Sequence, residues 1–315
     1  MISRTFITLV FLALLSSCID STDTKLQRFL LKGNEALIEG NSQQALYYFG
    51  ESLKLDSCFV DALNNSGTIY FKQGRYPEAL EFYSAVVSCK PDYLPVYFNR
   101  SNTFYELKEY YSALKDLDKI RLTKPDTFPL HFTEGLVYTK LRNYDKAEQS
   151  FTKASGLTTN NTEVLINLAT LAYYKNELDK SKTLLQKAIQ QNDSIANAYN
   201  TLALVELAFN NTSEALKAVN SALALDKDDA YALNNRGYIH LIENRLDAAL
   251  EDINQSIFID PSNAWAYRNK GIYYLKVKDY ANALRLFKQA KSMDDFVENI
   301  DKYIQEAEAG MAKKS

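Results

Sequence analysis

The sequence has few of the residues that most often carry chemistry. Among its 315 residues only two are histidine, three are cysteine and one is tryptophan, and it holds ten glycines and six prolines. Three cysteines are too few for a disulfide framework. The scarcity of glycine and proline, with 46% hydrophobic residues, is typical of a folded chain rather than a disordered one. A formal net charge of −3 argues against nucleic acid or an anionic lipid as a partner held by charge.

Catalytic and metal-binding motifs are missing as well. The chain has no metal-ligand spacing, no glycine-rich phosphate loop and no nucleophile elbow. We expect His131 and His240 to be buried or half-buried in the core, rather than to act as metal ligands or general bases. Cys58 and Cys89 are expected as a loop thiol and a core thiol, and a disulfide between them would need Cα atoms within about 7 Å. We therefore expect no enzyme, no cofactor and no metal.

The first eighteen residues predict export and a lipid anchor. A positively charged start precedes the apolar stretch 5–15. That stretch is too short to cross a bilayer, which takes roughly 20 residues, but it fits a signal peptide. Residues 15–18, Leu-Ser-Ser-Cys, resemble the lipobox of bacterial lipoproteins. The resemblance implies removal of residues 1–17, a diacylglycerol on Cys18 and, with Ile19 next, the outer membrane, while the face on which the protein lies stays open.

Small residues recur every 34 positions along the chain. A second small residue follows each one after twelve positions, and a bulky residue follows four positions later. The first column consists of Gly33, Gly67, Ser101, Gly135, Ala169, Ala203, Gly237 and Gly271. The bulky column consists of Phe49, Tyr83, Leu117, Phe151, Leu185, Val219, Ile253 and Phe287. Within each unit the apolar spacing is helical twice, with a turn between, and short side chains let the paired helices approach.

This pattern resembles the tetratricopeptide repeat family, whose consensus is similar to the stretches 235–238 and 260–263. The resemblance implies an all-α, right-handed superhelical solenoid of eight helix-turn-helix repeats, preceded by a lipidated tether at 18–25. The expected repeats are 26–59, 60–93, 94–127, 128–161, 162–195, 196–229, 230–263 and 264–297. Such arrays need a cap on the last repeat. We expect a capping helix and tail at 298–315, with Phe296, Ile300, Tyr303 and Ile304 on one face.

The resemblance also implies that the first helix of each repeat lines a concave groove. One groove position holds Asn65, Asn99, Asn167, Asn235 and Asn269. They resemble the asparagine ladder with which some family members grip a peptide backbone; the alternative is that asparagine is simply common at this place. Around the ladder we expect Phe98, Phe132, Tyr173, Tyr174, Tyr231, Tyr238, Trp265 and Arg268. Several of these rings could instead pack between helices. The lysines and arginines of a chaperone-type carboxylate clamp are absent.

These expectations combine into one functional hypothesis. The protein is a membrane-anchored scaffold or adaptor of the bacterial cell envelope, and its groove binds a partner protein or an extended peptide. An uncharged surface rich in rings and amides suits such a ligand, because rings supply contact area at low entropic cost. The same surface also suits a glycan, so the alternative is an accessory lipoprotein that binds glycan or peptidoglycan.

Overall fold

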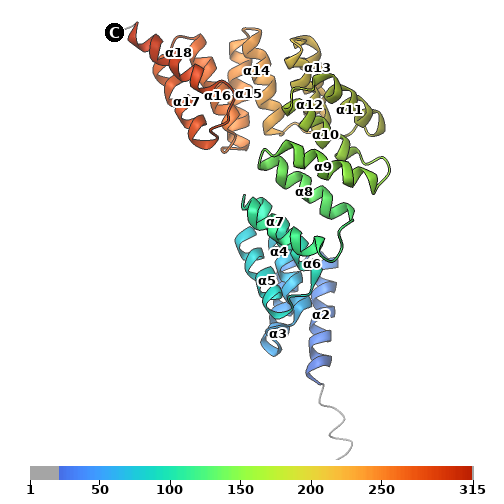
Figure 1. Ribbon diagram of the computed structural model, residues 1–315. Coiled ribbons are helices and arrows are strands. Elements are labelled where there is room, and N and C mark those ends of the chain that lie inside the picture. The colour runs from blue at the N-terminus through green and yellow to red at the C-terminus, as the bar shows by residue number, and fades with distance from the viewer. Residues whose placement is uncertain (1–20, 314–315) are drawn as a thin grey trace, which may run out of the picture. The chain divides into compact units, whose positions relative to one another are not determined.

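The computed structural model describes residues 21–313, and within this range the chain forms seventeen α-helices and no strands (Figure 1). The prediction of an all-α fold is confirmed. The chain divides into two compact units, Met1–Asn143 and Tyr144–Ser315. The predicted lipidation site, Cys18, lies outside the described residues, as does the signal peptide. No helix in the described part is long and apolar enough to cross a membrane.

The first unit consists of antiparallel helix pairs. Its helices are α2 (Thr22–Ile38), α3 (Ser42–Leu55), α4 (Val60–Lys72), α5 (Tyr76–Cys89), α6 (Leu94–Glu106), α7 (Tyr110–Arg121) and α8 (Phe128–Lys140). Each of α2, α4 and α6 packs most closely on the helix that follows it, as α4 does on α5. The first helices also contact one another from repeat to repeat, as α4 and α6 do.

The second unit repeats this arrangement. Its helices are α9 (Tyr144–Gly156), α10 (Thr162–Tyr174), α11 (Leu178–Gln191), α12 (Ala196–Ala208), α13 (Thr212–Leu225), α14 (Ala230–Ile242), α15 (Leu246–Ile259), α16 (Ala264–Lys276), α17 (Tyr280–Met293) and α18 (Ile300–Ala312). The first helices α10, α12, α14 and α16 pack side by side in this order. This row of first helices carries the site described below.

The backbone follows the 34-residue period in its turns. In every repeat one residue between the two helices has a positive φ angle, in the left-handed region. These residues are Gly40, Gly74, Lys108, Arg142, Asn176, Asn210, Asn244 and Lys278. Glycine adopts this conformation without strain and asparagine tolerates it, whereas other side chains oppose it. The repeat therefore imposes its turn geometry even where lysine or arginine occupies the position.

The small and bulky columns meet inside hairpins of both units. A Cβ atom added at Gly67 would lie 2.7 Å from Cε1 of Tyr83, and one added at Gly237 would lie 2.7 Å from Cγ1 of Ile253. Tyr83 and Ile253 are almost completely buried. The glycines therefore let the second helix place a large side chain directly against the backbone of the first.

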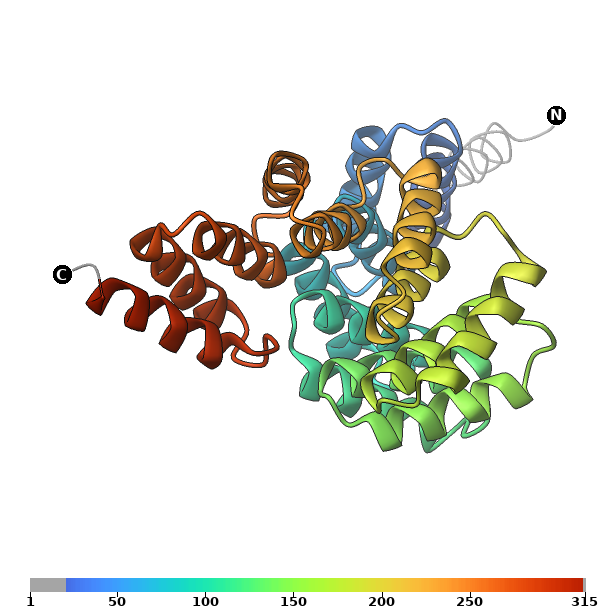
Figure 2. The same cartoon turned by 90° about the horizontal axis from the view of Figure 1, so that it is seen from above.

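Both ends of the array differ from the prediction in detail. Ser21 caps α2 by accepting a hydrogen bond from the Thr24 amide, so residues 22–25, assigned to the tether, are helical. The predicted capping helix is present as α18, which packs on α17 (Figure 2). Its predicted face is wrong at Phe296, which lies before α18 and is largely exposed. Val297 is buried there instead.

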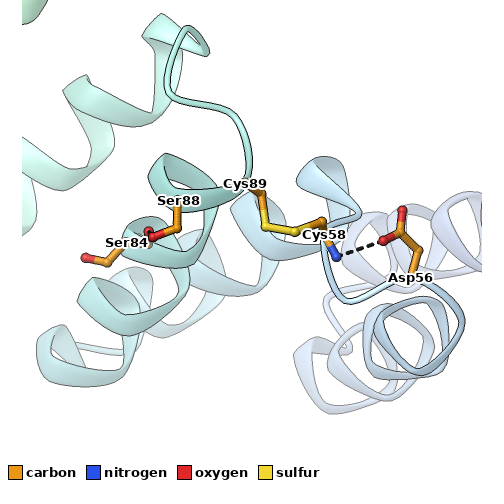
Figure 3. Close-up of a disulfide and its surroundings, with 5 residues drawn as sticks. All are labelled: Asp56, Cys58, Ser84, Ser88 and Cys89. Atoms are coloured by element: carbon orange, nitrogen blue, oxygen red, sulfur yellow. Dashed lines mark hydrogen bonds between the residues drawn. A yellow bond between two sulfur atoms is a disulfide. The ribbon is translucent and has the colours of Figure 1, made fainter.

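A disulfide joins Cys58 to Cys89 in the first unit, with their Cα atoms 5.5 Å apart (Figure 3). Cys58 lies in the turn between α3 and α4, where the Asp56 carboxylate accepts a hydrogen bond from its amide. Cys89 is the last residue of α5. The expected pair of free thiols is therefore wrong, because the end of one repeat meets the end of the next at bonding distance.

Candidate functional site

The predicted asparagine ladder is mostly a set of hydrogen bonds between repeats. In the first unit, Nδ2 of Asn65 donates to Oδ1 of Asn34 at 3.1 Å, and Nδ2 of Asn99 donates to Oδ1 of Asn64 at 2.9 Å. Each bond links the first helices of successive repeats. Each of these side-chain amides therefore uses one of its two N–H groups in a hydrogen bond within the protein, which the sequence did not predict.

In the second unit the same bonds form a continuous chain, which we call the amide relay and define as Arg268, Asn269, Asn234, Asn235 and Asn200. The Arg268 guanidinium donates to Oδ1 of Asn269 from Nε at 3.0 Å and from Nη2 at 2.9 Å. Nδ2 of Asn269 donates to Asn234 at 2.8 Å, Asn234 donates to Asn235 at 3.4 Å, and Asn235 donates to Asn200 at 2.8 Å. The relay connects α16, α14 and α12 and holds their polar side chains in fixed orientations.

Two residues expected in an open groove are buried within this relay. Asn269 is 1% exposed and Arg268 is 5% exposed. Their burial follows from the close packing of α14 against α16, which covers both side chains. Asn167 differs again, because its amide donates to the backbone carbonyl of Glu163 in its own helix at 2.9 Å. Contact of the five asparagines with a ligand stays a prediction.

A pocket of about 200 Å³ opens beside the relay, wholly within the second unit. It is lined by Tyr173, Leu204, Leu207, Ala208, Asn234, Asn235, Tyr238, Trp265, Arg268, Asn269 and Glu298. The helices α10, α12, α14 and α16 supply all of these except Glu298, which lies in the segment before α18. Six of the thirteen predicted groove residues thus converge on one pocket.

Two aromatic rings hold the guanidinium of Arg268. The Trp265 ring centroid lies 4.7 Å from its central carbon, and the Tyr238 ring centroid lies 5.0 Å away. Cation–π attraction of this kind is strongest where water is excluded. Burial lowers the pKa of Arg268, although an arginine keeps its charge in proteins. The pocket therefore has a positive charge at its base, between two rings.

Tyr173 supplies a hydroxyl group at the same pocket. Burial raises its pKa to about 12, and the nearby carboxylate of Glu298 acts in the same direction. The phenol therefore stays protonated at neutral pH and offers an O–H donor beside the positive charge.

The remaining predicted groove residues lie elsewhere. Phe98 packs half-buried against the core of the first unit, and Phe132 stacks on Phe128 with ring centroids 5.4 Å apart. Tyr231 and Tyr174 are about half exposed, and neither lines the pocket. The expectation that some rings pack between helices therefore holds for Phe98 and also for Tyr174, which stacks on Tyr144 of α9 with ring centroids 5.3 Å apart.

Asn200, Asn234 and the pocket's apolar wall at 204–208 were not among the predicted groove residues. A signal was present, because Asn64-Asn65 and Asn234-Asn235 form doublets five repeats apart. The histidines are buried as expected, at 3% exposed for His131 and 8% for His240. Within residues 21–313, no group of three or more histidines, cysteines or carboxylates could hold a metal ion.

Solved structures of similar fold include the APC/C hetero-tetramer Cut9–Hcn1, with a TM-score of 0.64 and 15% identity over 86% of this chain and 55% of that one. Yeast Tom70 matches with a TM-score of 0.56 and 21% identity over 92% of this chain and 64% of its own. PilF of Pseudomonas aeruginosa matches with a TM-score of 0.56 and 19% identity over 67% and 96%. This chain thus spans little more than half of the Cut9–Hcn1 chain, and at such identities the likeness shows the fold alone.

The sequence itself matches family models described as "Tetratricopeptide repeat". The matched residues are 60–93, 128–161, 166–230 and 200–264. Together they cover just over half of the chain. No curated protein matches the sequence. The 34-residue period, the helix pairs and these matches agree, and the chain belongs to the tetratricopeptide repeat family.

Proposed function

We propose that this protein is a lipid-anchored scaffold of the bacterial cell envelope, and that it holds a partner protein or extended peptide on the first helices of its second unit. The tetratricopeptide repeat fold supports a protein–protein interaction scaffold, and proteins built from it are typically not catalysts. The convergence of Tyr173, Tyr238 and Trp265 on one pocket carries the proposed binding site. Buried rings beside fixed polar groups are common in the centres of protein interfaces.

The surroundings of the pocket support a partner that reaches into it with one group. Drug-sized ligands usually occupy pockets of about 300–1,000 Å³. The volume here, about 200 Å³, is smaller than that and suits a single side chain or chain end. Leu204 and Leu207 on α12 add an apolar wall against which the rest of a partner segment can pack.

The Cys58–Cys89 disulfide supports the proposed export. Disulfides persist in oxidising compartments such as the bacterial periplasm or the cell surface and are rare in the cytosol. The lipobox-like sequence that ends at Cys18 supports a lipid anchor in the outer membrane. Since α2 begins at Thr22, a chain anchored at Cys18 has about four residues of tether, which span at most about 14 Å. The first unit would then lie close to the membrane.

The anchor is tested with the full-length precursor carrying Cys18→Ser. We expect the variant to fold, because Cys18 precedes the first described helix, and to leave the membrane fraction for the soluble fraction. Circular dichroism checks the fold, and sedimentation of lysed cells checks the anchor. A Cys18→Ser protein that sediments with membranes as fully as the wild type would refute lipidation at this site.

The binding surface is tested with a photo-crosslinking residue placed at Ala208, an exposed position on the rim of the pocket. The matched control is Asp247, an exposed position on the second helix α15. We expect a discrete protein adduct in cells from position 208 and none from position 247. Equal adducts at the two positions, or none at 208, would contradict the proposal. Retention of polysaccharide by the purified protein, without a protein adduct, would favour the glycan-binding alternative.

A further inference from the structure

Arg268 is a buried charge without a direct ion pair; the carboxylate of Glu298, in the same pocket, stabilises it only from a distance. Its side chain is 5% exposed, and across residues 21–313 no carboxylate lies within 4.0 Å of its guanidinium. The other buried or half-buried arginines of the repeats do have one: Arg100 pairs with Asp116 at 2.7 Å, and Arg236 pairs with Asp252 at 2.7 Å. Burial of an unpaired charge is costly. The exception at Arg268 lies in the pocket, where a ligand has room to form the missing ion pair.

The hydrogen bonds of Arg268 leave a suitable part of the guanidinium unused. An arginine has five N–H groups: one on Nε and two on each terminal nitrogen. Nε and Nη2 each donate to Asn269, and Nη1 donates to the carbonyl oxygen of Glu298 at a long 3.5 Å. One N–H group is therefore left on Nη1 and one on Nη2. Two donors on adjacent nitrogens match the two oxygens of a carboxylate.

We propose that the pocket binds one carboxylate of the partner, on Arg268. The inference rests on the proposed function, because it names the chemistry by which the partner is recognised. The carboxylate is either the side chain of an acidic residue or the free C-terminus of the partner chain. The amide relay positions Arg268, and the rings of Tyr238 and Trp265 keep its planar group in place.

Three features select a singly charged, planar anion. The guanidinium has two unused N–H donors and no direct ion pair, so a carboxylate supplies the two acceptor oxygens that it lacks. Tyr173 lines the same space, and its hydroxyl provides a further donor. Glu298 lines the pocket as well, and its negative charge opposes a doubly charged anion such as phosphate more strongly than a singly charged carboxylate. The arrangement differs from a clamp of several lysines and arginines, because a single buried arginine carries the recognition.

Trp265 makes the pocket directly observable, because it is the only tryptophan of the chain and lies over Arg268. Its fluorescence is followed during titration of the full-length protein in detergent. N-acetyl-glutamate N-methylamide tests a side-chain carboxylate, and N-acetyl-alanine tests a C-terminal carboxylate. N-acetyl-glutamine N-methylamide is the neutral control for the first probe, and inorganic phosphate tests a doubly charged anion. We expect a saturable change with one or both carboxylates and none with the glutamine analogue.

Two variants connect the signal to Arg268. Arg268→Met removes the charge, and the affinity for the carboxylate probe should fall about ten- to a hundred-fold, the usual effect of losing hydrogen bonds to a charged group. Asn269→Asp keeps the shape of the side chain and places a carboxylate on the guanidinium from within the protein. The Asn269→Asp substitution should lower the affinity for the carboxylate probe by a similar factor, while the circular dichroism spectrum stays unchanged. Unaltered probe affinity in a folded Asn269→Asp protein, or equal binding of the glutamine analogue, would overturn the proposal.

The two proposals fail in different ways. If position 208 crosslinks a protein partner equally well in wild type and in the folded Asn269→Asp variant, the carboxylate inference is wrong and the scaffold proposal stands. If the carboxylate probes bind in an Arg268-dependent way but no protein is crosslinked in cells, the pocket assignment stands and the scaffold proposal is wrong.

Discussion

The contact between small and bulky residues can be tested by adding a single methyl group. In Gly67→Ala the new Cβ atom would lie 2.7 Å from Cε1 and 2.9 Å from Cδ1 of Tyr83. The ring is fully enclosed, and its hydroxyl donates to Thr68 at 3.1 Å, so it cannot move aside freely. Overpacking costs about 1–3 kcal/mol and a lost hydrogen bond about 0.5–1.5 kcal/mol. Alanine favours the helix by about 1 kcal/mol relative to glycine. The free energy of unfolding should therefore fall by about 1–3 kcal/mol in total.

Gly50→Ala is the matched control in the same unit. Gly50 also lies inside a helix, α3, but no atom lies within 4 Å of its added Cβ. Here only the helix propensity changes, so the variant should gain about 0.5–1 kcal/mol. Equilibrium urea unfolding followed by circular dichroism measures both variants against the wild type. If Gly67→Ala proves as stable as Gly50→Ala, the two helices do not pack in the register described above.

Three further predictions concern other parts of the fold. Replacing Cys58 and Cys89 together by serine should lower the free energy of unfolding by about 2–4 kcal/mol, because the disulfide closes a loop of 31 residues; reduction of the wild type should give the same loss in a denaturation curve. Burial lowers the pKa of His240, so the unfolded chain takes up its proton first, and stability should fall as the pH drops below about 6.5. In His240→Phe this part of the pH dependence, measured by thermal unfolding between pH 5 and about pH 7.5, should be absent. Lys108 has a φ angle of 62°, so Lys108→Gly should raise the free energy of unfolding by about 0.5–1 kcal/mol. A lower free energy of unfolding in this variant would show that contacts of the lysine side chain stabilise the fold by more than the backbone strain destabilises it.

Much of the helical architecture could be predicted from the sequence because it rests on local packing. The 16-residue distance from Gly67 to Tyr83 is the same in every repeat, and the pairs that begin at Gly33, Gly67, Gly237 and Gly271 each meet within one hairpin. The last hairpin needs a cap, so the sequence predicted a capping helix and tail at 298–315. The structure has this helix as α18, Ile300–Ala312. The prediction failed at Phe296, because the Asp294 side chain accepts a hydrogen bond from its amide and shapes a turn there.

The candidate site was predicted only in part, because its residues act across repeats. The sequence indicated that Asn235, Asn269 and Arg268 lie on first helices. It contained no information on which amide meets which, since that depends on how closely α12, α14 and α16 approach one another. The same approach buries Arg268 between Tyr238 and Trp265. In the first unit, the packing of successive repeats likewise brings Cys58 within reach of Cys89. A 34-residue period by itself determined the helix pairs, whereas only the packing of neighbouring repeats decided which polar groups bind each other and which arginine is buried without a direct ion pair.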